Sequence, residues 1–320
     1  MKLQRFFVPI SLAAAIIITV FARLLDSYNL FLVGQMAILI IVTTALVILM
    51  GGAGLLSLSS AAFLGIGAYS TIILTSMFHV PFLLAVPLSA IVGALLGWLV
   101  GLVALRVSGF YLAIVTFGFL QIFAIFLKQG GDFTGGGYGL VSPSVSLPLI
   151  GELNTDSFAL IAVFLAVIAV VGAASLMRSR AGRSWLALRD NTPAAIMQGI
   201  NVRGMKLRAF ALSSAVISVA GAIYGYLLGS ASPSSFSVNV SIFHIALVVV
   251  GGLTGSLAGA VISPIVLFLI PQLFTELGQY EDLLYASLLL LVLIFLPKGI
   301  SSAVDGLGKK LWGDMRRKNA

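Results

Sequence analysis

The sequence contains no cysteine and very few charged residues. Of its 320 residues, 9% are charged and 60% are hydrophobic. Because a soluble domain carries about 25% charged residues, this chain has too little polar surface to solvate a globule. The lack of cysteine excludes disulfides, thiolate chemistry and cysteine-based metal sites. The composition therefore predicts an all-α, polytopic membrane helical bundle, in which each crossing takes about 20 mostly apolar residues.

The sequence lacks the residues that ion coupling, metal binding and ATP binding need. None of the ten acidic residues falls clearly in the middle of an apolar stretch, whereas ion-coupled carriers usually need a buried carboxylate. His79 and His244 stand apart and without nearby acids, so no metal site is expected. His244 is expected to be a satisfied interfacial histidine near the start of the eighth apolar segment. No phosphate-binding loop of the GxxxxGK[ST] type is present. The chain is therefore expected to be neither an enzyme nor an ATPase, and to need no cofactor.

Ten apolar segments are predicted to be transmembrane helices. The first is expected to be a retained helix, since its apolar run is longer than a signal-peptide core. The stretch 251–256 between the eighth and ninth segments is either a tight turn or a bend in one re-entrant element, so whether these two are full crossings is left open. The segments are about 6–25, 30–50, 55–78, 82–105, 109–128, 157–177, 209–229, 241–254, 257–275 and 283–297.

The distribution of charge predicts the orientation. Basic residues concentrate on the cytoplasmic side of membrane proteins. With ten crossings and both termini in the cytoplasm, all 18 basic residues except Arg23 and Lys128 lie inside. The outside receives most of the acids, which are Asp26, Asp132, Glu152, Asp156, Glu276, Glu281 and Asp282. The whole chain, 1–320, is expected to form a single transmembrane domain with an outer loop at about 129–156, an inner loop at about 178–208 and a basic cytoplasmic tail at 298–320.

The inner loop carries a short helix signal. Seven of its eight charged residues are basic, and a run of apolar residues lies among them. Thr192 is predicted to cap this helix, Pro193 to occupy its first position and Gly199 to end it. The helix, at about 193–198, would offer apolar surface through Ile196, Met197 and Ile200. It either lies in a groove of another protein or rests on the bilayer surface.

The same run resembles the cytoplasmic coupling loop of ABC importer permeases, and in particular the M-type subunit of the branched-chain amino acid permease family. Stretches at 54–69, 109–116, 134–140 and 295–300 extend the resemblance over most of the chain. Pro193 stands where the general importer motif has glutamate. The residues that the resemblance assigns to ATPase coupling are Arg189, Asp190, Asn191, Thr192, Pro193, Ala194, Ala195, Ile196, Met197, Gly199 and Ile200.

The resemblance implies a transporter subunit in the plasma membrane, which is the inner membrane of a bacterium. Its implied partners are a second permease, usually in a heterodimer, two cytosolic ATPases and an external solute-binding protein. Branched-chain amino acids are the implied substrates; urea, short amides, aromatic acids or sugars are alternatives. A passive channel, a secondary carrier and a membrane enzyme are the competing classes outside ABC transport.

Small residues between 51 and 68 suggest either close helix packing or a helix that lines the translocation path. For the second interpretation the candidate residues are Ser57, Ser59, Ser60, Gly65, Gly67 and Gln121. The glycines of the outer loop form either a flexible turn or a contact with the solute-binding protein. The candidate contact residues there are Thr134, Gly135, Gly136 and Gly139.

Overall fold

Apolar helices make up most of the structure. The computed structural model describes residues 26–104, 109–147, 151–252 and 257–273. The helices are α2 (Ser27–Leu46), η1 (Val47–Gly52, a π-helix), α3 (Ser60–Ser76), α4 (Phe82–Ala104), α5 (Phe110–Gln129), η2 (Gly131–Phe133), α6 (Thr155–Arg178), α7 (Arg180–Asp190), α8 (Thr192–Met197), α9 (Val202–Leu227), η3 (Pro233–Phe236), α10 (Val238–Gly251) and α11 (Leu257–Leu273). Four two-residue strands, β1 (Leu140–Val141), β2 (Ser146–Leu147), β3 (Gly151–Glu152) and β4 (Ser230–Ala231), pair antiparallel as β1–β4 and β2–β3.

The predicted apolar segments correspond to these helices. Five helices are long and apolar enough to cross a membrane, namely Ser27–Gly52, Phe82–Val103, Tyr111–Gln129, Thr155–Arg178 and Val202–Leu227. Three shorter apolar helices, Ser60–Ser76, Val238–Gly251 and Leu257–Leu269, join them. The predicted segments 6–25 and 283–297 and the tail 298–320 lie outside the described residues. The chain is thus a multi-pass helical membrane protein, as its composition predicts.

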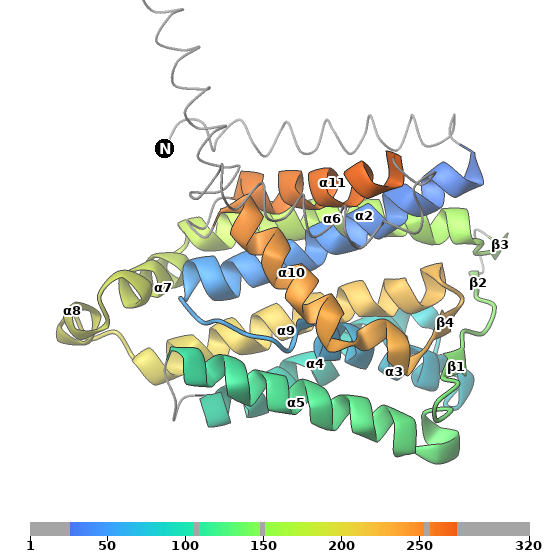
Figure 1. The fold of residues 1–320 in the computed structure, drawn as a ribbon, viewed down its shortest axis with the longest axis horizontal. Coiled ribbons are helices and arrows are strands. Elements are labelled where there is room, and N and C mark those ends of the chain that lie inside the picture. The colour runs from blue at the N-terminus through green and yellow to red at the C-terminus, as the bar shows by residue number, and fades with distance from the viewer. Residues whose placement is uncertain (1–25, 105–108, 148–150, 253–256, 274–320) are drawn as a thin grey trace, which may run out of the picture.

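The connections gather at two ends of the bundle. Figure 1 shows α7 and α8 at one end and the four strands at the other. The first end, here the basic end, carries Arg178, Arg180, Arg183, Arg189 and Arg203. The second, here the acidic end, carries Asp26, Asp132, Glu152 and Asp156. The charges therefore separate in space as the sequence predicts.

Helix α9 lies at the centre and packs against α2, α3 and α4. Serine and glycine allow this close contact, since small side chains let helix backbones approach. Ser213 donates to the carbonyl of Ala45 at 2.9 Å, and Ser218 donates to that of Phe63 at 3.1 Å. Helix α9 begins at Val202, seven residues before the predicted start at 209, so its first two turns belong to the basic end.

The predicted helix at 55–78 begins later than expected. Residues 53–59 have no helical structure, and α3 starts only at Ser60. Most of these residues are nevertheless buried, among them Leu55, Ser57 and Ser59. Figure 1 shows this stretch returning into the bundle from the basic end, where η1 ends. The bundle therefore contains a non-helical segment, residues 53–59, which we call the broken segment.

Helices α10 and α11 are separate elements. Helix α10 ends at Gly251, and Gly252 follows with a φ of 106°. The two helices pack through Gly251 and Gly259, and no side chain would fit between Gly259 and the carbonyl of Gly251. With 14 residues, α10 extends only about 21 Å at 1.5 Å per residue. It is therefore too short to span a bilayer core of about 30 Å unaided.

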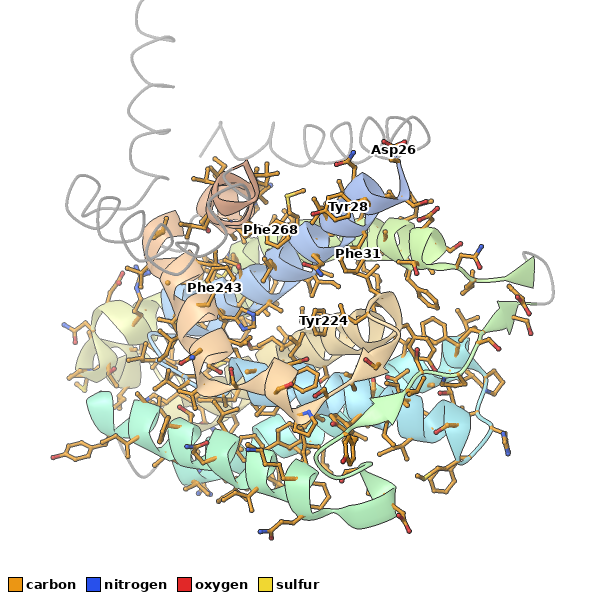
Figure 2. All side chains as sticks on the ribbon, turned by 45° about the vertical axis from the view of Figure 1, so that its right-hand side comes forward. Asp26, Tyr28, Phe31, Tyr224, Phe243 and Phe268 are labelled. Atoms are coloured by element: carbon orange, nitrogen blue, oxygen red, sulfur yellow. The ribbon has the colours of Figure 1, made fainter. Side chains whose placement is uncertain are left out.

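Apolar side chains also cover the outside of the bundle. Half-buried aromatic residues from α2, α9, α10 and α11 lie on the side seen in Figure 2, where Phe31, Tyr224, Phe243 and Phe268 are labelled. Leu83, Ile91 and Leu95 of α4 are each largely exposed. Such surface is stable against lipid tails or other apolar helices.

Candidate functional site

The short helix α8 at the basic end has defined start and stop signals. Asn191 caps it, because its side-chain oxygen accepts from the amide of Ala194 at 3.1 Å. The prediction that Thr192 is the cap is wrong, since Thr192 is the first helical residue and its hydroxyl donates to the carbonyl of Leu188 at 2.8 Å. Pro193 is consequently the second residue of the helix rather than the first. Gly199 follows with a φ of 76°, so the predicted left-handed stop is confirmed.

Two apolar side chains of α8 face away from the protein. The side chains of Ile196 and Met197 are 55% and 90% exposed. Ala195 is buried and fixes the opposite face of the helix. Ile200 packs against the core, so the prediction that it adds to the apolar surface is wrong. The large exposed apolar side chains of the described inner loop are thus two adjacent residues.

Helix α7 holds α8 to the bundle. Trp185 is buried and its indole nitrogen donates to the carbonyl of Met205 in α9, at 2.8 Å. Arg189, at the end of α7, donates to the carbonyl of Gly51 in η1 and forms an ion pair with Asp190 at 2.9 Å. Arg189 therefore points toward the bundle. Residues 180–200, which we call the coupling segment after the role that the sequence predicts for them, are connected to both α9 and η1.

A buried polar cluster lies where the broken segment meets α3. The hydroxyls of Ser57 and Ser59 are 2.8 Å apart, and the amide of Leu58 donates to the hydroxyl of Thr116 in α5 at 2.9 Å. The bond to Thr116 satisfies a backbone amide that has no helical partner and that lipid could not satisfy. Ser57 and Ser59 were candidates for the translocation path, a role that stays a prediction, whereas Thr116 did not stand out from its apolar neighbours.

The same cluster extends to α10. Ser60 lies 3.4 Å from Ser241, hydroxyl to hydroxyl, and the Ser241 hydroxyl accepts from the amide of Ala61 at 3.0 Å. The Nδ1 atom of His244 lies 3.2 Å from the Ser60 hydroxyl. His244 is buried and hydrogen-bonded, as the sequence predicts. We call Ser57, Ser59, Ser60, Thr116, Ser241 and His244 the polar seam.

Other predicted path residues lie elsewhere. Gly67 packs directly against the backbone of Ser218 in α9. Gly65 faces the rings of Phe123 and Phe236, because a Cβ there would lie 2.6 Å and 2.9 Å from their atoms. Gln121 is exposed on the surface of α5 rather than placed among the buried serines. These positions favour helix packing for Gly67 and an outward role for Gln121.

The glycine-rich part of the outer loop, residues 134–140, is an ordered turn. Thr134 is buried and its hydroxyl donates to the carbonyl of Leu127 at 2.8 Å, so it fixes the loop and offers no free contact surface. Gly135, Gly136 and Gly139 all have a positive φ, and Gly139 lies against the backbone of Ala231. Strand β1 follows and pairs with β4, and Ser142 donates to the carbonyl of Gly229 at 3.0 Å. At the tip, Tyr138 is 99% exposed.

Metal ligands do not gather anywhere in residues 26–104, 109–147, 151–252 or 257–273. No group of three or more histidine, cysteine, aspartate or glutamate side chains could hold an ion in these ranges. The side chains of the polar seam offer hydroxyl groups and one imidazole. Such groups form hydrogen bonds to a polar solute, and none of them carries a fixed charge.

Comparison with known proteins identifies the family of the chain. A model of the permease component of branched-chain amino acid transport systems matches residues 28–296. The chain belongs to this permease family. It is 32% identical over 288 residues to the high-affinity branched-chain amino acid transport system permease protein LivM of Escherichia coli, which covers 82% of this chain and 67% of that protein. The residues that the family model matches run from the second residue of α2 to beyond the end of α11.

Two further relatives are less similar, and one of them is named for a sugar. A probable branched-chain amino acid transport permease protein LivM of Methanocaldococcus jannaschii is 22% identical over 68% of this chain and 67% of its own length. The ribose import permease protein RbsC of Haemophilus influenzae is 26% identical over 68% of both chains. No solved structure matches. The chain is thus a permease component of an ABC-type transporter, and its relatives are transport subunits rather than enzymes.

Proposed function

We propose that this chain is one membrane subunit of an ATP-driven importer for branched-chain amino acids. In this proposal it acts as a single permease domain in the bacterial inner membrane, beside a second permease subunit. Two cytosolic ATPase subunits bind the basic end, and an external solute-binding protein binds the acidic end. Basic loops favour the cytoplasmic side, and the separation of charge between the two ends supports this orientation.

The observation that carries the proposal is the exposure of Ile196 and Met197 on a capped, anchored helix. Ordering an isolated six-residue helix is unfavourable in water, yet Asn191 and Ala195 hold α8 in place. A preformed apolar projection loses little entropy when a partner covers it. A groove in an ATPase subunit is therefore the binding partner that we propose. Rest on the bilayer surface is the alternative.

We propose that the polar seam forms part of the translocation path. Ser57, Ser59 and Ser60 are buried at a break between helices, and broken helices form midplane sites in other transporters. Uncharged hydroxyls bind a zwitterionic solute weakly and let it leave. This weak contact agrees with an importer whose specificity lies mainly in the external binding protein.

The outer loop is the proposed contact for that binding protein. Residues 136–138 lie at the tip of the ordered turn, and the aromatic ring of Tyr138 is free to insert into a partner. Aromatic side chains are frequent anchors of protein interfaces. Asp132 lies beside this turn, so a partner surface with basic residues around an apolar pocket would fit.

The substrate class is supported by the relatives. Both proteins named LivM that are described above carry branched-chain amino acids in their names. The ribose permease of Haemophilus influenzae is a more distant relative, so a pentose is the second candidate. Uptake of labelled leucine, ribose and urea by cells with and without the transporter genes would decide between these solutes. Uptake of ribose or urea without leucine would refute the amino-acid assignment.

The coupling role is tested by Ile196→Asp combined with Met197→Asp. We expect the double variant to insert normally but to lose the ATPase subunits on purification, and its uptake to fall about tenfold or more, as at other interface hot spots. Gln198→Asp is the matched control, because it adds a charge to the same segment without removing apolar surface. Full uptake and normal ATPase retention by the double variant would contradict the proposal.

A further inference from the structure

Arg189 is held between the coupling segment and the bundle. Its Nη1 atom donates to the carbonyl of Gly51, and its Nε donates to Asp190 at 3.0 Å. Its side chain is 28% exposed, against 66% for Asp190. A guanidinium group has several donors in a rigid plane and can bind two acceptors at once. Arg189 is therefore placed for an internal connection rather than for contact with another protein.

The stem of the same side chain touches the start of the broken segment. Gly54 has a φ of 68°, and a Cβ at this position would lie 2.9 Å from the Cγ of Arg189. Glycine is required here both by the backbone conformation and by the close approach. Arg189 thus contacts the end of η1 through its guanidinium group and the following turn through its methylene groups.

The two ends of the broken segment have different attachments. Its first residues are bonded to η1, since the amides of Ala53 and Leu55 donate to the carbonyls of Ile48 and Leu49, both at 3.1 Å. Its last residues belong to the polar seam, where Leu58 donates to Thr116. A shift of η1 therefore moves the chain that carries Ser57. Short π-helices of this kind are frequent at functional sites.

We infer that Arg189 transmits movement of the coupling segment to the polar seam through Gly51 and the broken segment. The inference rests on the proposed coupling role of α8. Helix α8 is bonded to α7 through Thr192 and Leu188, so displacement of Met197 moves the end of α7. The charge-assisted bond to Gly51 transfers this movement to η1. Arg189 is thus a positioning residue, which acts on the path without touching the solute.

The absence of cysteine allows a direct test in the complete transporter, reconstituted with its ATPases and binding protein. Ser57→Cys is labelled with N-ethylmaleimide with and without ATP, and the modification of this chain is measured by mass spectrometry. With Arg189 present, we expect the two labelling rates to differ about tenfold, a typical coupling between sites. With Arg189→Met added, the ratio should approach one, while the ATPases stay bound and hydrolyse ATP.

Two further variants serve as controls. Arg183→Met removes the same charge from the same helix, but within the described part of the chain the Arg183 side chain bonds locally, to the carbonyl of Arg178 at 2.7 Å. It should keep the tenfold ratio. Arg189→Lys keeps the charge without the planar donors, so its ratio should be intermediate. This variant also provides the test if Arg189→Met does not fold.

Several outcomes would overturn the inference. The inference is overturned if either Arg189 variant shows the same ratio of labelling rates, with and without ATP, as the parent. It is also overturned if Arg189→Met loses the ATPases, since Arg189 would then act at their interface. Failure of the proposed function is a different result. In that case Ser57→Cys labelling would not respond to ATP in the parent, and the Ile196→Asp, Met197→Asp variant would retain its ATPases.

Discussion

Gly67 of α3 lies directly against the backbone carbonyl of Ser218 in α9, with no room for a methyl group between them. We expect Gly67→Ala to push the two helices apart. Overpacking of this kind costs about 1–3 kcal/mol. Thermal unfolding in lipid nanodiscs should therefore show a midpoint several degrees below that of the parent.

Gly118 of α5 is the control for this prediction. No atom lies within 4 Å of the position that its Cβ would take. Alanine is favoured over glycine in a helix by about 1 kcal/mol, so Gly118→Ala should keep or raise the midpoint. Equal losses in the two variants would mean that helix contact at Gly67 does not determine stability.

Two buried tyrosines are expected to respond differently to loss of the hydroxyl group. The hydroxyl of Tyr226 forms a hydrogen bond with Thr75, whereas that of Tyr69 has no partner in the described part of the chain. A typical hydrogen bond contributes about 1 kcal/mol, and an unpaired buried polar group is itself unfavourable. Tyr226→Phe should lower the unfolding midpoint, and Tyr69→Phe should leave it unchanged or raise it.

A different result at Tyr69 would be informative. If Tyr69→Phe keeps its midpoint but reduces uptake, the free hydroxyl has a partner during transport. If its midpoint falls as much as that of Tyr226→Phe, the described arrangement of α3 is wrong. The two variants should be measured in the same lipid, because detergent changes helix packing independently of either hydroxyl.

The cap of α8 predicts a local effect on coupling. Asn191 accepts from Ala194, and replacing such a cap by alanine costs about 1 kcal/mol. Asn191→Ala should therefore loosen α8 and reduce uptake several-fold, while Asn191→Asp, which still accepts this bond, should retain uptake. Amide hydrogen exchange over residues 192–197 should be faster in the alanine variant. Unchanged exchange would show that Thr192 and Ala195 alone are sufficient to hold the helix.

The orientation of the chain can be measured at two exposed side chains. Met197 and Tyr138 are 90% and 99% exposed at opposite ends of the bundle. We expect a membrane-impermeant maleimide to label Tyr138→Cys in spheroplasts and Met197→Cys only in inverted vesicles. The reverse pattern would place the coupling segment outside and would remove the basis for ATPase binding.

Hydropathy predicts most of the helices because a long apolar run in lipid has to bond its backbone internally. The broken segment is the exception. Its amide at Leu58 bonds to Thr116, 58 residues away in sequence, and the amide of Ala61, at the start of α3, bonds to Ser241, 180 residues away. Apolar content is the same whether such a stretch is helical or extended, so hydropathy does not reveal the break.

The sequence predicts only part of the candidate site, because some of its features depend on contacts between helices. The start and stop of α8 follow from local chemistry, but Asn191 and Thr192 are both good caps, and the bond from Thr192 to Leu188 decides between them. The inward direction of Arg189 depends on η1, and the outward face of Gln121 depends on how α5 packs. Both are set by contacts between helices that sequence spacing does not specify.

The length of helix α9 connects the two ends of the bundle. The helix contains 26 residues and is therefore about 39 Å long, a rod that reaches from Trp185 at one end to the paired strands β1 and β4 at the other. Because a helix barely compresses, a tilt at one end of α9 moves its other end. In the proposed transporter, a partner that binds at one face of the membrane would therefore tilt α9 and shift the strands at the other face before any solute enters.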